Sequence, residues 1–309
     1  MIEVENLTKY YGTYCALDKV SFSVRKGEIL GFLGPNGAGK STTMKVITCF
    51  LSPTEGSVKV DGLDVVEKSL EVRKRIGYLP ETPPLYHDMT VKNYLEFAGT
   101  IKGVAPGALK KNVEMAVEKC GLTNYYYVQC RALSKGYRQR VGIAQAIVHD
   151  PIVLILDEPT IGLDPIQIVE IRNLIKGFGG DHTVVLSTHI LPEVDMTCER
   201  VLIINDGKVI AEDTTKNLKS NIPQTEHLLL EVAGGGDALG DDLKSIDGVT
   251  EVTSEASESG STVYKIHVVS DTDPRVEISR TVARKNIDLL EFKNVSLSLE
   301  DIFINVTMN

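Results

Sequence analysis

A glycine-rich segment that ends in a lysine and two hydroxyl residues is the strongest chemical signal in the sequence. Residues 34–41 read GPNGAGKS and match the pattern G-x-x-x-x-G-K-[S/T]. An apolar run precedes the segment and a helical pattern follows it, so backbone N–H groups at a helix N-terminus can surround phosphate oxygens. Lys40 would add a positive charge at the outer phosphates, and Ser41 a hydroxyl ligand for Mg²⁺. The segment predicts a phosphate site formed by Gly34, Pro35, Asn36, Gly37, Ala38, Gly39, Lys40, Ser41 and Thr42.

Two adjacent carboxylates end an apolar run of strand length. Residues 152–160 read IVLILDEPT, so a buried strand would deliver Asp157 and Glu158 to its carboxyl end, where ligands bind in open α/β sheets. Side chains alternate along a strand, so neighbouring acids point in different directions. We expect Asp157 beside Mg²⁺ and Glu158 as the general base for a water molecule. Alone, the pair would be read as two solvated charges, but the phosphate loop favours the catalytic interpretation.

Strand-like and helical patterns alternate through about residue 220, which predicts a layered α/β unit with a largely parallel sheet. The Asp-Gly pairs at 61–62 and 206–207 predict hairpin turns, and Asp164 followed by Pro165 predicts a helix start. The expected strands are 29–33, 76–79, 152–156, 183–187 and 201–204, and the expected helices are 42–50, 137–149 and 165–178.

The character of the chain changes after residue 220. Residues 221–309 hold 16 acidic and 7 basic residues, whereas residues 1–220 hold 26 of each. An acidic segment is unsuited to bind nucleic acid, so no nucleic-acid partner is expected. The pattern of residues 227–295 predicts the order β-α-β-β-α-β, typical of a small split α/β sandwich. We therefore predict two domains, 1–220 and 221–309.

Composition excludes several protein classes. The 309 residues are 42% hydrophobic and 24% charged, which is typical of a folded chain with a sizeable core. No apolar run reaches the length of a membrane span, and the first residues lack the pattern of a secretory signal. The five cysteines are scattered without a C-x-x-C pair, which favours reduced thiols over a disulfide framework or zinc site.

Further motifs, in order along the chain, resemble those of ATP-binding-cassette (ABC) ATPase subunits. Residues 133–140 read LSKGYRQR, where the family signature is L-S-G-G-Q, and they precede a helix 23 residues ahead of the acidic pair. Alone, most of these residues would be ordinary: a surface tyrosine, a helix cap, a histidine at a strand end. Their order around the two strong motifs carries the resemblance, which covers residues 1 to about 220.

The resemblance implies a fold and a role for each matching residue. The fold would be a P-loop NTPase ABC cassette, with a parallel-sheet core, an antiparallel β subdomain and a helical subdomain, plus a small C-terminal α+β domain. Tyr11 would stack on adenine, and Glu81 would stand near Mg²⁺ where the family usually has glutamine. His189 would lie at the γ-phosphate as a catalytic partner of Glu158, and Asp164 would belong to the D-loop.

The signature segment departs from the family pattern at two positions. It consists of Ser134, Lys135, Gly136 and Tyr137, so a lysine replaces glycine and a tyrosine replaces glutamine. By resemblance, these residues cover the γ-phosphate of ATP bound to an opposite subunit, where Lys135 would add positive charge. Glu81 is a third departure, because a carboxylate only accepts hydrogen bonds whereas an amide also donates them.

By resemblance, the chain would hydrolyse Mg²⁺-ATP in a head-to-tail dimer of cassettes, as a homodimer or heterodimer. It would drive transport, with export as the expected direction, through a separate integral-membrane permease, and would lie on the cytoplasmic face of the cell membrane. Residues 82–97 would dock the permease through exposed apolar or aromatic side chains, or these side chains would form the core of the following helix; they are Leu85, Tyr86, Met89 and Tyr94. The IGYLPE segment, the signature and residues 299–307 most resemble ABC-2-type exporter subunits.

Two alternatives stay open at this stage. One is an ABC ATPase that serves translation or DNA repair, although such proteins usually carry two cassettes or a long coiled-coil insertion, and no sustained heptads occur here. The other is a nucleotide-gated scaffold with little turnover, which the altered signature favours and the presence of Glu158 and His189 disfavours. A dinucleotide-binding oxidoreductase is excluded, since GPNGAGKS is not a G-x-G-x-x-G loop.

Overall fold

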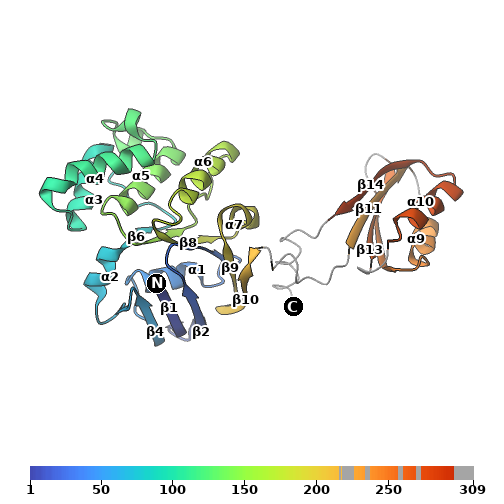
Figure 1. Ribbon diagram of the computed structural model, residues 1–309, viewed down its shortest axis with the longest axis horizontal. Coiled ribbons are helices and arrows are strands. Elements are labelled where there is room, and N and C mark those ends of the chain that lie inside the picture. The colour runs from blue at the N-terminus through green and yellow to red at the C-terminus, as the bar shows by residue number, and fades with distance from the viewer. Residues whose placement is uncertain (216, 218–225, 234–236, 257–259, 269–272, 296–309) are drawn as a thin grey trace. The chain divides into compact units, whose positions relative to one another are not determined.

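The computed structural model consists of two compact units, Met1–Thr215 and Lys216–Asn309 (Figure 1). It describes residues 1–215, 217, 226–233, 237–256, 260–268 and 273–295. The C-terminal segment 299–307 therefore lies outside the described residues. Within the described part, no helix is both long enough and apolar enough to cross a membrane. All five cysteines are free thiols.

A six-stranded sheet forms the centre of the first unit. Its strand order is β10-β9-β3-β8-β7-β6, and every neighbouring pair is parallel except β9 with β10. Apolar residues dominate the inner strands because helices and a second sheet cover both faces. The strands are β3 (Ile29–Leu33), β6 (Ile76–Leu79), β7 (Val153–Asp157), β8 (Thr183–Thr188), β9 (Arg200–Asn205) and β10 (Lys208–Thr214). This arrangement confirms the predicted α/β class and all five predicted strands.

A second, antiparallel sheet packs on the first and shares its core. Its strand order is β2-β1-β4-β5, from β1 (Ile2–Tyr11), β2 (Tyr14–Val24), β4 (Glu55–Val60) and β5 (Leu63–Asp64). Helix α1 (Lys40–Ile47) contributes Met44 and Ile47 to a continuous core that includes Leu17 and Phe32. The loop between β3 and α1 is therefore held between the two sheets.

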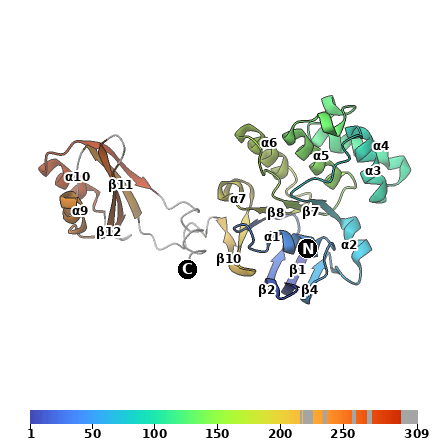
Figure 2. The same cartoon turned by 180° about the vertical axis from the view of Figure 1, so that it is seen from behind.

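Helices enclose the rest of this unit. Figure 2 shows α3, α4 and α5 gathered as a helical part beside the sheets, and the 3₁₀ turns η1 and η2 lie between α4 and α5. The helices are α2 (Ser69–Arg75), α3 (Val91–Ile101), α4 (Pro106–Lys119), α5 (Lys135–Ile147), α6 (Pro165–Lys176) and α7 (Leu191–Thr197), and the turns are η1 (Thr123–Tyr125) and η2 (Cys130–Ala132). The three predicted helices correspond to α1, α5 and α6.

The second unit has the predicted β-α-β-β-α-β order. It consists of β11 (Glu226–Ala233), α9 (Asp237–Lys244), β12 (Val249–Ala256), β13 (Ser261–Val268), α10 (Arg275–Arg284) and β14 (Leu289–Val295). The strand order β12-β13-β11-β14 is antiparallel throughout, as in ferredoxin-like folds. Tyr264, Leu230 and Ile278 belong to a separate apolar core.

The two Asp-Gly turns and the helix start that the sequence predicts all occur in the structure. Asp61 and Gly62 join β4 to β5, and Asp206 and Gly207 join β9 to β10, all with positive φ angles of 45° to 75°. Positive φ at both central residues is the requirement of a type I′ hairpin. At the start of α6, the Asp164 carboxylate accepts a hydrogen bond of 2.9 Å from the Gln167 N–H, and Pro165 is the first helical residue.

A buried ion pair anchors the entry to β3, the strand that leads into the phosphate loop. The Arg200 guanidinium donates to both Glu28 oxygens, at 2.7 and 3.0 Å, and the Arg25 N–H donates to Glu28 Oε2 at 2.7 Å. Burial alone would raise the pKa of Glu28, but these hydrogen bonds outweigh it and lower the pKa below its ordinary value. The ionised form of Glu28 thus stabilises the fold.

We predict that Glu28→Gln lowers the free energy of unfolding by about 2 kcal/mol at about pH 7, because a charged hydrogen-bonded pair is lost. Since the folded-state pKa is lowered, this contribution exists above the ordinary glutamate pKa and disappears as the pH falls through the lowered one. Urea unfolding should show a smaller difference in the free energy of unfolding between the native chain and the variant at about pH 3 than at about pH 7. Glu212→Gln removes a more exposed partner of the same arginine, so it should lower the free energy of unfolding by less than Glu28→Gln does.

Candidate functional site

The phosphate loop lies between β3 and α1, as predicted. Its backbone takes left-handed angles at Gly37 (φ 85°) and at Gly39 (φ 104°), and Gly39 caps α1. A Cβ built on Gly34 would lie 2.4 Å from the Ile204 carbonyl oxygen, and one built on Gly39 would lie 2.6 Å from Leu17 Cδ2. Glycine is therefore required here both for conformation and for space.

Lys40 is almost fully buried, with 5% of its surface exposed. Its ammonium donates to the carbonyl oxygens of Gly34 at 2.7 Å and Pro35 at 3.1 Å, which closes the loop on itself. The same nitrogen lies 3.3 Å from Glu158 Oε1. A buried cation with these partners is held in one position at the mouth of the loop.

The acidic pair ends β7 beside the loop. The Ser187 hydroxyl, on the neighbouring strand β8, donates to Asp157 Oδ1. The Glu158 N–H donates to the Ser187 carbonyl oxygen at 3.0 Å, while Glu158 itself takes a positive φ of 50°. A positive φ is uncommon for a residue other than glycine, so the surroundings of Glu158 hold its backbone in this conformation.

Glu158 lies between two cationic or ionisable neighbours. His189 Nδ1, just beyond β8, is 2.9 Å from Glu158 Oε2, and Lys40 Nζ faces Oε1. The Glu158 side chain is 6% exposed and His189 37% exposed, so the row runs from the interior to the surface. Among the described residues, no group donates a hydrogen bond to Oε1. Apart from its ion pair with Lys40, this buried carboxylate oxygen therefore has no partner among the described residues.

A cavity of about 410 Å³ lies in front of this row. It brings together many of the predicted site residues: Tyr11, Asn36, Gly37, Gly39, Lys40, Ser41, Thr42, Glu81 and Glu158. Tyr11 and Tyr14 face each other across the turn between β1 and β2, and both line the cavity. The remaining loop residues, Asp157 and His189 are outside its wall. The walls thus combine aromatic rings at one end with a cation, hydroxyls and carboxylates at the other.

The oxygen donors near the loop fit a magnesium ion. Ser41 and Glu81 line the cavity, and Asp157 ends the adjacent strand with its Oδ1 already accepting from Ser187. Mg²⁺ prefers hard oxygen ligands and usually keeps several of its waters beside substrate phosphates. The described residues contain no cluster of three or more His, Cys, Asp or Glu that could hold a metal by itself. Such a donor set suits an ion that arrives with a nucleotide.

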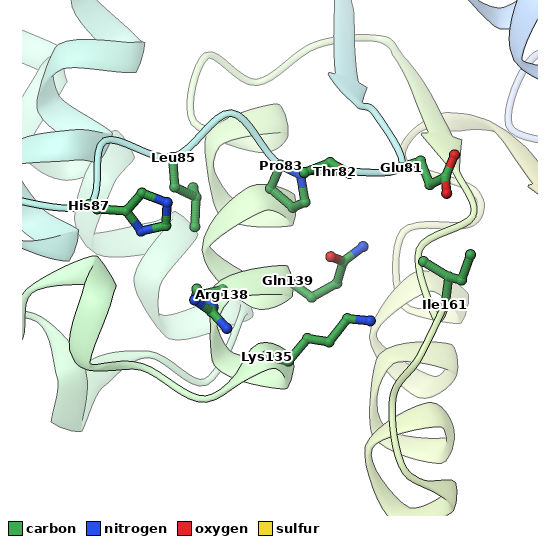
Figure 3. Close-up of a pocket in the computed structure, with 9 residues that line it drawn as sticks. All are labelled: Glu81, Thr82, Pro83, Leu85, His87, Lys135, Arg138, Gln139 and Ile161. Atoms are coloured by element: carbon green, nitrogen blue, oxygen red, sulfur yellow. The ribbon is translucent and has the colours of Figure 1, made fainter.

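The signature residues lie apart from this cavity. Ser134 caps α5 by accepting from the Tyr137 N–H at 3.4 Å, and the Tyr137 ring lies 4.0 Å from that of Tyr125. A Cβ built on Gly136 would lie 2.5 Å from Gln167 Oε1, so the start of α5 lies against the Gln167 side chain of α6. Lys135 lines a second cavity instead, which shares Glu81 and Ile161 with the first (Figure 3). Asp164, the helix cap of α6, lines neither.

Sequence patterns missed a polar network behind the acidic pair. Glu193, on α7, is buried and accepts hydrogen bonds from Thr160 at 2.5 Å and Thr188 at 2.9 Å. It thereby ties the loop after β7 to the end of β8, the two segments that carry Glu158 and His189. No motif spacing marks Glu193, because its partners are brought together only by the parallel pairing of β7 with β8.

The predicted docking segment is less exposed than the sequence suggested. Tyr94 is only 4% exposed, and its hydroxyl donates to the Pro84 carbonyl oxygen at 3.2 Å, so for this side chain the structure shows the core of the helix and not a docking surface. Leu85 and Met89 are half-buried. Tyr86, which is 53% exposed, does present its ring at the surface. Tyr94 is buried because it is on the face of α3 that packs against the rest of the helical part.

We predict that Glu193→Gln destabilises the fold by about 1–2 kcal/mol, because an amide nitrogen cannot accept the hydrogen bond that one threonine hydroxyl donates. Urea unfolding measures the difference, with Glu118→Gln on the exposed face of α4 as the control for the same substitution at the surface. An equal effect in both variants would mean that the buried network contributes nothing.

Comparison with known proteins agrees with this geometry. Residues 17–161 match the family model described as ABC transporter. The chain is 32% identical to the linearmycin resistance ATP-binding protein LnrL of Bacillus subtilis (strain 168), with 99% of this chain and 98% of LnrL covered. It is 33% identical to the bacitracin transport ATP-binding protein BcrA of Enterococcus faecalis, with 98% of this chain and 95% of BcrA covered.

A solved structure matches the first unit. It is the dimeric post-hydrolysis state of the ATP-binding cassette MJ0796 bound to ADP and Pi, with a TM-score of 0.64, 28% identity, and coverage of 69% of this chain and 98% of that chain. The predicted cassette fold is thereby confirmed. Since the relatives are similar over nearly their whole lengths, the chain belongs to the ATP-binding proteins of ABC transporters, a family of P-loop ATPases.

Proposed function

We propose that this ATPase is the motor subunit of an ABC-2-type exporter and that it hydrolyses ATP in the cavity between the phosphate loop and Glu158. The observation that carries the proposal is the buried Glu158 Oε1, which accepts no hydrogen bond from the described residues and faces Lys40 at 3.3 Å. A general base needs an available lone pair in a position that a substrate or water can reach. Glu158 lines the cavity and meets both conditions.

Each part of the cavity suits one part of ATP. The Tyr11 ring, 46% exposed and beside Tyr14, would stack on the adenine, while the loop N–H groups would surround the phosphates. When a phosphate arrives, it would compete with Glu158 for the Lys40 ammonium. That exchange would release the carboxylate to accept a proton from the attacking water. Phosphoryl transfer of this kind depends on positioning and charge rather than on covalent chemistry.

His189 would orient the Glu158 carboxylate and contact the γ-phosphate. Its Nδ1 lies 2.9 Å from Glu158 Oε2, which orients the carboxylate, and its partly exposed ring leaves Nε2 free to face a phosphate. Ser41, Glu81 and Asp157 would hold Mg²⁺, either directly or through water. The ion, when bound, would neutralise charge on the phosphate oxygens.

A second cassette would complete the site. Ser134, Lys135, Gly136 and Tyr137 do not line the cavity of their own chain, so they are free to cover ATP bound to an opposite subunit in a head-to-tail homodimer or heterodimer. The related MJ0796 cassette is described as dimeric in its post-hydrolysis state. Asp164 would lie at the interface as part of the D-loop.

This subunit would lie at the cytoplasmic face of the membrane, and a separate integral-membrane permease would use the free energy of ATP binding and hydrolysis. LnrL and BcrA are named for linearmycin resistance and bacitracin transport, which supports an export role for a chain that matches them over nearly its whole length. The segment 82–97 would dock the permease, with Tyr86 exposed at its centre. Residues 221–309 would form an accessory domain that regulates cassette closure or contacts the permease.

We predict that Glu158→Gln lowers the rate of ATP hydrolysis at least about a hundredfold, because the amide cannot accept the proton of the attacking water. ATP binding should persist, since the side chain keeps its size. The checks are Mg²⁺-dependent phosphate release and oligomeric state by size in ATP, where the variant should accumulate as a dimer. Glu170→Gln, an exposed acid on α6, is the matched control. If Glu158→Gln hydrolysed ATP at the rate of the native chain, Glu158 would be excluded as the general base.

We predict that Glu81→Gln changes the Mg²⁺ dependence of hydrolysis more than the affinity for ATP. Loss of one carboxylate at the cavity wall should raise the Mg²⁺ concentration for half-maximal rate roughly tenfold. Titration of Mg²⁺ at fixed ATP, beside nucleotide binding measured without turnover, separates the two quantities. Superimposable Mg²⁺ titrations for the native chain and the variant would remove Glu81 from the ion's surroundings.

A further inference from the structure

The turn between β9 and β10 contacts the phosphate loop, although it does not line the cavity in front of that loop. Its buried Gly207 donates its N–H to the Ala38 carbonyl oxygen at 3.1 Å, and its own carbonyl oxygen accepts the Asp18 N–H at 2.9 Å. The Lys208 ammonium, 3.3 Å from Asp18 Oδ2, adds an ion pair between β10 and β2. The turn thus joins the loop to β2 through main-chain hydrogen bonds.

Close packing leaves this turn little freedom to move. A Cβ built on Gly207 would lie 2.7 Å from the Ala16 carbonyl oxygen, and one built on Gly39 would lie 2.9 Å from the same atom. At the end of β9, the Ile204 carbonyl oxygen lies against Gly34, the first residue of the loop. The turn, β2 and the loop therefore meet almost backbone to backbone at these glycines, so a small shift of the turn must also shift its neighbours.

The hydrogen bond to Ala38 fixes the direction of one donor in the loop. A trans peptide unit is planar, and its C=O and N–H point in opposite directions. The Ala38 carbonyl oxygen is directed at Gly207, so the Gly39 N–H, which belongs to the same peptide unit, is directed away from the turn. Gly39 is one of the residues that line the cavity. The turn therefore controls the direction of an N–H group that can reach a phosphate oxygen.

Gly207 has two separate reasons to be a glycine. Its φ of 73° lies in the left-handed region, where a Cβ is strained, and the space beside Ala16 is too small for a Cβ. The other Asp-Gly turn, between β4 and β5, separates the two reasons. Its Gly62 has a φ of 75°, but a Cβ built there would meet nothing within 4 Å. An alanine strains the backbone in either turn, and only Gly207→Ala forces its turn to move relative to β2 and the loop.

We propose that Gly207 is a positioning residue for nucleotide binding: through Ala38 it aims the Gly39 N–H at the phosphates, although it does not touch the nucleotide itself. The proposal rests on the proposed function, since it takes the phosphates to lie in the glycine-rich loop. Ile204 supports the same loop from β9. Because the general base and its histidine partner are held by β7 and β8, the turn acts on the affinity for nucleotide rather than on the hydrolytic step.

The test measures the affinity for Mg²⁺-ADP, which binds without turnover, by calorimetry on the full chain and on Gly207→Ala and Gly62→Ala. We expect Gly207→Ala to weaken Mg²⁺-ADP about tenfold, the effect of losing one hydrogen bond to a charged group. Gly62→Ala should bind as the native chain does, because Asp61 in that turn donates to the Met1 carbonyl oxygen rather than to the loop. Pyrophosphate, which lacks the adenosine part, should lose affinity by the same factor as Mg²⁺-ADP.

A second measurement follows the donor itself. In the full chain labelled with ¹⁵N-glycine, the Gly39 amide signal should move when pyrophosphate is added, because a hydrogen bond to an anion deshields the proton. This movement should be smaller in Gly207→Ala and unchanged in Gly62→Ala. The hydrolysis rate at saturating ATP should stay within about twofold of the native rate in both variants, while the ATP concentration for half-maximal rate rises only in Gly207→Ala.

Two conservative variants provide the same test if Gly207→Ala does not fold. Ile204→Val removes the Cδ1 methyl group, which lies 3.5 Å from the place of a Cβ on Gly39, so it should weaken Mg²⁺-ADP about threefold. Ile203→Val is the control, because the neighbouring side chain on β9 is equally buried but points to the opposite face of the sheet. It should bind Mg²⁺-ADP as tightly as the native chain does.

Equal affinities of Gly207→Ala and Gly62→Ala for Mg²⁺-ADP, or a loss that pyrophosphate does not share, would overturn the proposal. Where Gly207→Ala is unfolded, equal affinities of Ile204→Val and Ile203→Val would overturn it. The native chain tests the proposed function separately. If the native chain binds neither Mg²⁺-ADP nor pyrophosphate, the nucleotide cavity is rejected together with the role of the turn; if it binds both and the variants do not differ, only the role of the turn is rejected.

Discussion

The ion pair between Lys40 and Glu158 is the interaction on which the catalytic half of the structure depends. It joins the start of α1 to the end of β7, at the edge where the parallel strands of the central sheet finish. Two opposite charges with almost no exposure compensate each other's loss of hydration, so each needs the other when no ligand is present. The glycine turns, the left-handed backbone of Glu158 and the Thr160–Glu193–Thr188 network all serve to hold these two side chains at one distance.

The sequence could predict those features whose residues are neighbours in the chain. The phosphate loop, the acidic pair, the Asp-Gly turns and the α6 cap each depend on neighbours in the chain, and each occurs in the structure where it was expected. The split sandwich of the second unit was likewise readable, because its strands alternate and its helices carry an apolar face. Local patterns of this kind survive folding because the forces that create them act over a few residues.

Features built by distant segments escaped prediction for the opposite reason. Glu193 meets its partners Thr160 and Thr188 only when β7 and β8 pair. For Tyr94 the sequence allowed either a docking surface or the core of its helix, and only the tertiary packing of α3 decides for the core. The contact of Gly136 on α5 with the Gln167 side chain of α6 likewise joins two helices whose approach no single motif encodes.

Glu81 is the one carboxylate that borders both cavities, and this has a thermodynamic consequence. A ligand in either cavity would meet this carboxylate, so each ligand would act on the position of the same side chain. Linkage then requires reciprocity: whatever factor nucleotide binding applies to the affinity for a ligand of the second cavity, that ligand applies to the affinity for nucleotide. One charged wall residue, beside the shared Ile161, is thus sufficient to make the two binding equilibria interdependent without any rearrangement of the sheets.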